Sequence, residues 1–151
     1  MGRLAWAIGV LLLSGSSPTD AGSLALSPTR LELSSGHAVD AVTVTNQSGE
    51  ATVVQLEAMA WNKAQGQDIY TPTTDLIAAP PIFTVPPGGT QIVRIGLRRA
   101  PDPQRELAYR VYFQEIPPPP KVGFQGLQIA LRLGVPVYVA PASGTLPKDG
   151  R

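Results

Sequence analysis

The sequence predicts an all-β protein, a single immunoglobulin-like antiparallel β-sandwich of about seven strands. Short runs in which apolar and polar residues alternate recur through residues 24–141, separated by turns rich in Gly, Pro, Asn and Ser. No window of eleven or more residues in this part of the chain has the periodicity of an amphipathic helix. A chain of 151 residues is long enough for one domain, which we place at residues 24–141.

The predicted strands are residues 24–33, 37–46, 51–62, 82–85, 90–98, 107–116 and 127–139. The first contains Pro28, which donates no main-chain hydrogen bond, so we expect this strand to bend or to lie at a sheet edge. In the second, Val42 and Val44 point inward. The third alternates along its whole length, with Gln55 and Glu57 on the outward face.

The fourth predicted strand is short and lies between proline-rich turns. The fifth and sixth bury an apolar side chain at every second position and turn Arg94 and Arg110 outward. We expect both arginines, together with Arg98 and Arg99, to be solvated.

The seventh predicted strand is unusually long. Every odd position from Leu127 to Val139 is apolar, and at about 3.3 Å per residue the strand would run roughly 40 Å, about twice the usual length. Pro136 favours an edge position or a bulge. An exposed apolar edge strand promotes aggregation, so we expect another part of the chain or a partner to cover it.

Residues 1–21 are predicted to be a secretory signal peptide. Arg3 precedes an apolar run over residues 4–13, and small and polar residues follow up to Ala21. An apolar run of about ten residues is too short to span a bilayer, which disfavours a membrane anchor. Residues 142–151 are polar and unpatterned, and we interpret them as a tail or a truncated linker.

Charge and cysteine content limit the partners. Without residues 1–21 the chain keeps 11 basic and 10 acidic side chains, a net charge of +1. This balance suits neither nucleic acid nor a membrane surface. The chain has no cysteine, so an exported protein of this sequence must be stable without disulfides, which suits a bacterial periplasm.

The sequence predicts no catalytic site, no metal and no cofactor. His37 is the only histidine, and its spacing from Asp40 is not expected to form a dyad, so we predict a solvated or hydrogen-bonded structural role. The glycine pair at 88–89 enters a strand and not a helix, which argues against a phosphate-binding loop. The Asn-Gln-Ser at 46–48 matches a glycosylation acceptor, but turn chemistry explains it better.

Four stretches together resemble the PapD-like periplasmic chaperones of pilus and fimbrial assembly. They are SPTRLEL (27–33), APPIFTVPPGGTQIVRI (79–95), YRVYFQEIP (109–117) and LQIALRL (127–133). Their order and spacing are similar to those of the N-terminal domain of these chaperones. The resemblance implies a periplasmic protein of pilus biogenesis, with pilin subunits and an outer-membrane usher as partners.

The resemblance also implies an occupant for the apolar strand. Family members lend this strand to a pilin subunit that lacks its own final strand, and chaperone–pilin complexes are themselves an established case of strand addition. Leu127, Ile129 and Leu131 match the donor positions, and Gln125 is a weaker fourth match.

Family members also bind the subunit's C-terminal carboxylate with an arginine on the first strand and a lysine on the seventh. Arg30 matches the arginine, whereas Pro136 stands at the position of the lysine. Arg132 lies four residues earlier on the same strand face and is the candidate substitute. A guanidinium group suits this role because it binds a carboxylate through two parallel hydrogen bonds.

Two alternatives stay open. The chaperones usually have two immunoglobulin-like domains, and this chain resembles only the first, so it is also consistent with a truncated domain that self-associates through its edge strand and has no chaperone activity. A hydrolase or sugar-binding domain is retained because a fold does not dictate function. That alternative requires a convergent polar pocket.

Overall fold

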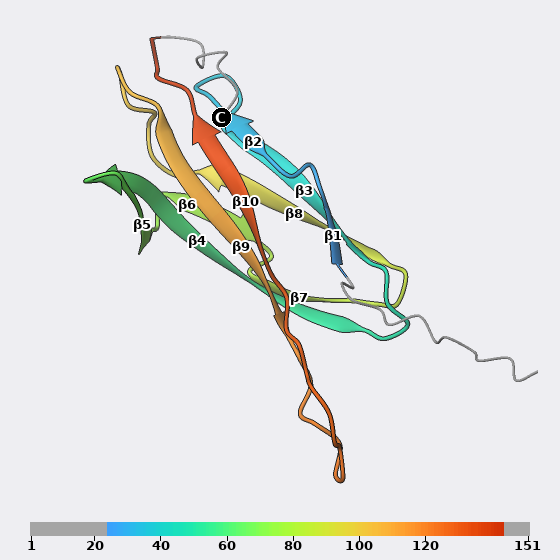
Figure 1. Cartoon of the computed structure of the whole chain (residues 1–151). Helices are drawn as coiled ribbons and strands as arrows, with labels where there is room; N and C mark the ends of the chain where they lie inside the picture. The colour runs from blue at the N-terminus through green and yellow to red at the C-terminus, as the bar shows by residue number, and fades with distance from the viewer. Residues whose placement is uncertain (1–23, 144–151) are drawn as a thin grey trace, which may run out of the picture.

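The computed structural model describes residues 24–143, which form two β-sheets packed face to face (Figure 1). A four-stranded sheet has the order β1-β3-β8-β6, and a six-stranded sheet has the order β2-β10-β9-β4-β5, with β7 also paired to β4. The strands are β1 (Leu24–Ser27), β2 (Leu31–Leu33), β3 (Val39–Asn46), β4 (Thr52–Ala64), β5 (Gln67–Pro72), β6 (Leu76–Ala79), β7 (Ile82–Val85), β8 (Thr90–Leu97), β9 (Leu107–Ile116) and β10 (Arg132–Val139). The predicted all-β, immunoglobulin-like fold is confirmed.

The first predicted strand is two strands in two different sheets. β1 pairs with β3, whereas β2 pairs with β10 in the other sheet. The chain crosses between the sheets at Pro28, where the missing N–H ends the first ladder. The predicted bend is therefore confirmed, and the strand after it is parallel to its neighbour, unlike the other strand pairs among the described residues.

The structure contains two strands that were not predicted, β5 and β6. Strand β5 has five exposed positions out of six, so its sequence lacks the alternation that identifies a half-buried strand. It is held in the sheet by a tight hairpin with β4, in which Gln65 and Gly66 both have positive φ, at 53° and 76°. Strand β6 has only four residues, too few to show a period.

The core lies between the sheets and contains the inward side chains of both. Val42 and Val44 are fully buried, as predicted. They belong to one core cluster with buried side chains of β9 and β10. The largest fully buried side chains are Leu31, Leu33, Val42, Val44, Val54, Val85, Val93, Ile95, Val111, Phe113, Val135 and Val137.

The last strand is shorter than predicted. β10 begins at Arg132, and residues 127–131 have no strand partner among the described residues. β10 pairs with β9 along its whole length, but with β2 only from Val137 to Val139. It is therefore an edge strand only as far as Pro136, which fits the absence of an N–H at that residue.

Residues 1–21, the predicted signal peptide, lie outside the described residues, as do 144–151 of the predicted tail. Within residues 24–143 there is no helix of the length and apolarity needed to cross a membrane.

The turn after β3 is organised by the side chain of Asn46. This side chain is fully buried, donates hydrogen bonds to the carbonyl oxygens of Glu50 (2.7 Å) and Val85 (3.0 Å), and accepts them from the backbone N–H (3.0 Å) and hydroxyl (2.8 Å) of Ser48. Turn chemistry thus explains the Asn-Gln-Ser sequence, as predicted. A buried amide of this kind is not accessible to glycosylation.

Replacing Asn46 with Ala is expected to lower the free energy of unfolding by about 2–3 kcal/mol, because it leaves buried main-chain groups without partners. Urea denaturation measures the change. The matched control is Gln47→Ala, whose side chain is exposed and whose effect should stay within about 0.5 kcal/mol. Equal stability of the two variants would contradict the assigned role.

Candidate functional site

An arm formed by residues 117–131 joins β9 to β10 and extends away from both sheets (Figure 1). It carries the side chains predicted to contact a partner. Leu127 is 82% exposed and Ile129 is 67% exposed. Leu131 is half-buried at the root of the arm, and Gln125 is exposed.

The root of the arm is fixed by Glu115 on β9. The Glu115 backbone N–H donates to the carbonyl of Leu131 (2.8 Å), and the Leu131 N–H donates to the Glu115 carboxylate (3.3 Å). Farther out, the side-chain amide of Gln128 donates to the carbonyl of Pro118 (2.8 Å). At the tip, the Phe124 N–H donates to the carbonyl of Lys121 (2.9 Å).

The four prolines at 117–120 explain why the arm does not pair with itself as a hairpin. They follow β9 directly and donate no main-chain hydrogen bonds, so the β9–β10 ladder cannot continue beyond Ile116. Residues 127–130 therefore present main-chain donors and acceptors that no described strand pairs with. This is an open strand edge with an apolar face.

The outer face of the six-stranded sheet carries a second group of conspicuous side chains. Three arginines lie against aromatic rings there, and we call this surface the arginine–aromatic face. Its members are Arg30, Trp61, Tyr70, Arg110, Tyr112, Arg132 and Tyr138.

Arg30 lies in the bend between β1 and β2 and not within a strand. Its guanidinium carbon is 4.3 Å from the centre of the Tyr138 ring, and its Nη2 is 3.0 Å from the carboxylate of Glu32. The side chain is thus positioned by a ring and a carboxylate, and it remains 39% exposed.

Arg132 is the first residue of β10 and stands beside the root of the arm. Its guanidinium carbon is 4.1 Å from the centre of the Tyr112 ring, and its Nη2 is 2.9 Å from the carboxylate of Glu57 on β4. Its charge is therefore already paired within the domain.

The structure does not bring Arg30 and Arg132 together. Arg30 contacts Tyr138, which lies six residues along β10 from Arg132. At about 3.3 Å per residue, this separation is roughly 20 Å.

Arg110 is the member of this face whose role the sequence analysis missed. It was predicted to be solvated, but its Nε is buried and has no hydrogen-bond partner among the described residues. Its guanidinium carbon is 5.1 Å from the Trp61 ring centre and 5.4 Å from that of Tyr70. The alternation of apolar and polar residues along β9 correctly predicted that Arg110 lies on the outer face. It does not indicate which aromatic rings of the neighbouring strands contact this side chain.

Small residues make this packing possible. Trp61 and Tyr138 are on strands at either side of β9, with ring centres 6.0 Å apart, and the β9 residue between them is Ala108. A Cβ atom on Gly134 would lie 3.0 Å from Cδ of Arg110 and 3.2 Å from Cε1 of Tyr112. A side chain at residue 134 would therefore require Arg110 and Tyr112 to shift by a few tenths of an ångström.

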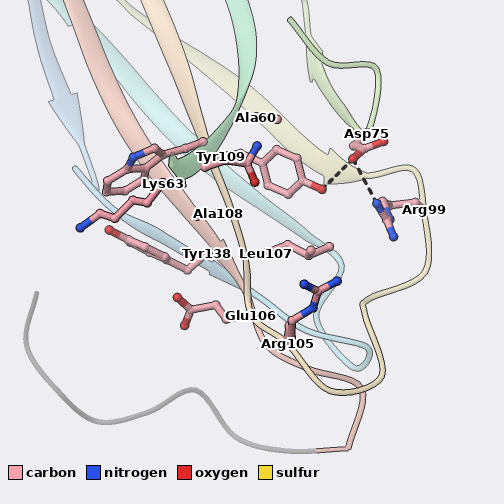
Figure 2. Close-up of a pocket in the computed structure, with 12 residues that line it drawn as sticks. Ala60, Lys63, Asp75, Arg99, Arg105, Glu106, Leu107, Ala108, Tyr109 and Tyr138 are labelled. Atoms are coloured by element: carbon pink, nitrogen blue, oxygen red, sulfur yellow. Dashed lines mark hydrogen bonds and ion pairs between the residues drawn. The ribbon is translucent and has the colours of Figure 1, made fainter. Parts of the chain in front are cut away.

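A cavity of about 730 Å³ opens beside Tyr138, toward the end of β10 that is remote from the arm (Figure 2). On its wall the Tyr109 hydroxyl donates to the Asp75 carboxylate (2.8 Å), and Arg99 lies 3.5 Å from the same oxygen. Burial, reinforced by the hydrogen bond to Asp75, raises the pKa of Tyr109 well above its usual value. The polar groups of Tyr109, Asp75 and Arg99 are thus partners of one another.

His37 and Asp40 are closer than predicted. The imidazole Nε2 is 3.4 Å from the Asp40 carboxylate. The expectation that alternation would separate them is wrong, because His37 precedes β3 and is not part of a strand. His37 is exposed, as expected for a solvated histidine, and Asp40 is half-buried. The described residues contain no group of His, Cys, Asp and Glu side chains that could hold a metal ion.

The sequence matches one protein-family model over residues 23–145. That model is described as the pili and flagellar-assembly chaperone, PapD N-terminal domain. None of the curated proteins matches the sequence.

Several solved structures are similar to this chain. They include the chaperone–tip adhesion subunit pre-assembly complex CsuC–CsuE from archaic chaperone-usher Csu pili of Acinetobacter baumannii (TM-score 0.68, 18% identity) and the E. coli chaperone DraB (TM-score 0.64, 22% identity). A third is the Salmonella enterica SafA pilin in complex with the SafB chaperone (TM-score 0.63, 20% identity). The matches cover 80%, 82% and 79% of this chain and 57%, 57% and 54% of those chains, so this chain spans just over half their length. At these identities the similarity concerns the fold.

Gly134→Ala is expected to lower the free energy of unfolding by about 1–3 kcal/mol, because the new methyl group overlaps Arg110 and Tyr112. Urea denaturation followed by tryptophan fluorescence measures the change. In the control Gly36→Ala, the new Cβ has no atom within 4 Å, and the change should be within about 0.5 kcal/mol. A wild-type midpoint for Gly134→Ala would show that the face tolerates a side chain there.

Tyr109→Phe is expected to cost about 1 kcal/mol at neutral pH through the lost hydrogen bond. Because the folded-state pKa of Tyr109 is raised, its contribution to stability is complete below the unfolded-state pKa of about 10 and declines as the pH rises above it. Urea midpoints measured from pH 7 upward should therefore fall less steeply above pH 10 in the variant than in the wild type. Parallel curves would exclude this linkage.

Proposed function

Because the chain belongs to the family of pili and flagellar-assembly chaperones, as a PapD N-terminal domain, we propose that it is a periplasmic chaperone domain for pilin subunits. It binds and caps a subunit by lending it the arm that precedes β10, without catalysis. Residues 1–21 act as the signal peptide that exports it. An outer-membrane usher is the further partner that receives the loaded subunit.

The observation that carries this proposal is the state of the arm. Leu127 and Ile129 are exposed at alternate positions of a segment whose main chain has no strand partner among the described residues. A segment in this state suits strand addition, in which main-chain hydrogen bonds provide affinity and alternate side chains enter pockets. Two of the similar structures contain a chaperone together with a pilin or a tip adhesion subunit, so the fold is compatible with such complexes.

The donor residues have separate roles in this proposal. Leu127, Ile129 and Leu131 enter apolar pockets of the subunit, and Gln125 occupies a shallower position nearer the tip of the arm. Burying an exposed Leu or Ile side chain contributes about 1.5–3 kcal/mol. The two exposed residues together therefore supply a substantial part of the affinity.

Arg30 binds the C-terminal carboxylate of the subunit in this proposal. It is held by Tyr138 and Glu32 but keeps 39% of its side chain exposed. Arg132, the second candidate from the sequence, stands at the root of the arm. Its position there is better suited to contact with the donated arm than to contact with a carboxylate that is bound at Arg30.

The alternative function is self-association. An unpaired edge with exposed Leu127 and Ile129 can pair with the same edge of a second copy. This would make the chain a domain that forms oligomers and has no pilin partner. The two functions use the same residues, so a mutation alone does not distinguish them. The identity of the bound protein distinguishes them.

The test is co-expression of the tagged protein in the periplasm with pilin subunits of the source organism, one at a time. Size-exclusion chromatography and intact mass identify any complex. The wild type is expected to form a 1:1 complex. Ile129→Asp should reduce its yield at least about 100-fold, because a carboxylate replaces an apolar side chain in a closed pocket.

Ala130→Asp is the matched control, since it introduces the same charge at the next residue, on the opposite face of an extended segment. It should retain the complex. A wild type that forms only oligomers of itself would establish self-association. Equal loss of the complex in both variants would refute insertion of alternate side chains.

A further inference from the structure

The β9–β10 ladder ends in a residue pair that is completed by a side chain. The register pairs Gln114 with Arg132, so Glu115 and Leu131 are the next pair along the two strands. In an antiparallel ladder, the two residues of a hydrogen-bonded pair exchange two main-chain bonds. Here the Glu115 N–H donates to the Leu131 carbonyl (2.8 Å), but the Leu131 N–H donates to the Glu115 carboxylate (3.3 Å).

Gln114 uses the main-chain acceptor that this arrangement leaves open. Its side-chain amide donates to the carbonyl oxygen of Glu115 (3.0 Å), which would accept the Leu131 N–H in a regular ladder. The N–H and the carbonyl of Leu131 are thus both bonded to Glu115, although the regular pairing has ended. The Glu115 carboxylate therefore fixes the main chain where the arm leaves the sheet.

Arg132 fixes the next residue of the chain from the outer face of the sheet. Strands β10 and β4 are not neighbours, because β9 lies between them. Arg132 nevertheless contacts Glu57 on β4 (2.9 Å), and its guanidinium carbon lies 4.1 Å from the ring centre of Tyr112 on β9. No other ion pair within residues 24–143 joins two strands.

The two contacts hold consecutive residues from opposite faces. Phe113 is fully buried, so Glu115, two residues farther along β9, lies on the core side of the sheet. Arg132 lies on the outer side, since it is an odd number of residues from the buried Val135. The main chain at residues 131–132 is therefore held on both sides.

We infer that Glu115 and the Arg132–Glu57 pair are positioning groups for strand addition. They fix the direction in which the arm leaves the sheet, so that Leu127 and Ile129 extend from a main chain that is already ordered at its root. Such ordering favours binding because less conformational entropy is lost when the partner binds. The inference rests on the proposed function, and in it Arg132 acts through the arm and not as a direct ligand of the partner.

The first test measures the order of the root and does not require a subunit. NMR gives the exchange rate of the Leu131 amide hydrogen in the exported protein. Glu115→Ala is expected to raise this rate about tenfold, as for loss of a hydrogen bond to a charged group. Glu115→Gln should keep it within about threefold, because its amide oxygen still accepts. The Val135 amide, inside the β9–β10 ladder, is the reference and should not change. A wild-type Leu131 rate in Glu115→Ala would overturn the role of Glu115.

The second test measures the formation of the complex with a subunit. A pilin subunit kept unfolded in urea is diluted into each variant, and size-exclusion chromatography measures the 1:1 complex formed with time. Glu115→Ala, Arg132→Gln and Glu57→Gln are each expected to slow its formation about fivefold, the lower end of the entropy cost of ordering one residue. The complexes, once formed, should dissociate within about twofold of the wild-type rate, because the subunit then orders the arm.

Glu57→Gln distinguishes positioning from direct contact. This variant removes the partner of Arg132 but keeps the guanidinium charge, so direct binding of the subunit by Arg132 would leave complex formation unchanged or faster. Slower formation in Arg132→Gln alone would therefore overturn the inference. The double variant should be no slower than either single variant, because both lack the same contact. Arg132→Lys, which keeps the pair with Glu57, should restore most of the rate.

Asp40→Asn is the matched control, since it removes a carboxylate from the four-stranded sheet, and it should form the complex within about twofold of the wild-type rate. Urea denaturation identifies any variant that is not folded, and Glu57→Gln then replaces Arg132→Gln in the comparison. A wild type that forms no complex would refute the chaperone function and the positioning role together. Normal complex formation in all variants would refute the positioning role alone and leave the chaperone function intact.

Discussion

A β-strand needs a neighbouring strand for its main-chain hydrogen bonds. Because the four prolines after Ile116 donate no such bonds, β9 cannot continue as a partner for the segment that precedes β10. The alternating apolar pattern continues through this point without a change. Its second half, in β10, provides Val135 and Val137 to the core, whereas its first half carries Leu127 and Ile129 into solvent. The stable sandwich and the open arm are thus two parts of one pattern, separated at the place where the ladder ends.

The same strand determines what the outer face can carry. β10 has Gly134 and Pro136 at consecutive outward positions, so it offers no long side chain at the centre of the six-stranded sheet. Arg110 and Tyr112 of β9 occupy that space, and the rings of Trp61 and Tyr70 close over Arg110 from β4 and β5. Strand β5 has little buried apolar surface. Its main contribution to packing is Tyr70, which it places at this contact.

The arm and the arginine–aromatic face meet at Arg132, the first residue of β10. Arg132 stands at the root of the arm, and Arg30 lies near the opposite end of β10. A partner that pairs with the arm and places an anionic end near Arg30 must span most of the length of β10. A one-residue slip would turn every side chain of the arm to the other face, so alternate pockets for these side chains would set the register of pairing.

The sequence by itself determined which residues of each strand face the core, because period-two alternation records burial on one face of a single strand. It also predicted the break at Pro28 and the apolar face at Leu127 and Ile129. It did not show that the strand after Pro28 joins the other sheet, that β5 forms, or that His37 meets Asp40. Those outcomes depend on which segments become neighbours, and alternation carries no information about neighbours.

Arg110 illustrates the limit best. Its sequence position indicates an outward side chain, and on a lone strand an outward arginine is solvated. The tertiary structure decided otherwise, because the pairing of β4, β5, β9 and β10 brings two aromatic rings to Arg110 and leaves its Nε buried. The environment of an outer-face side chain is set by the strands beside it, and only the folded sheet determines what they are.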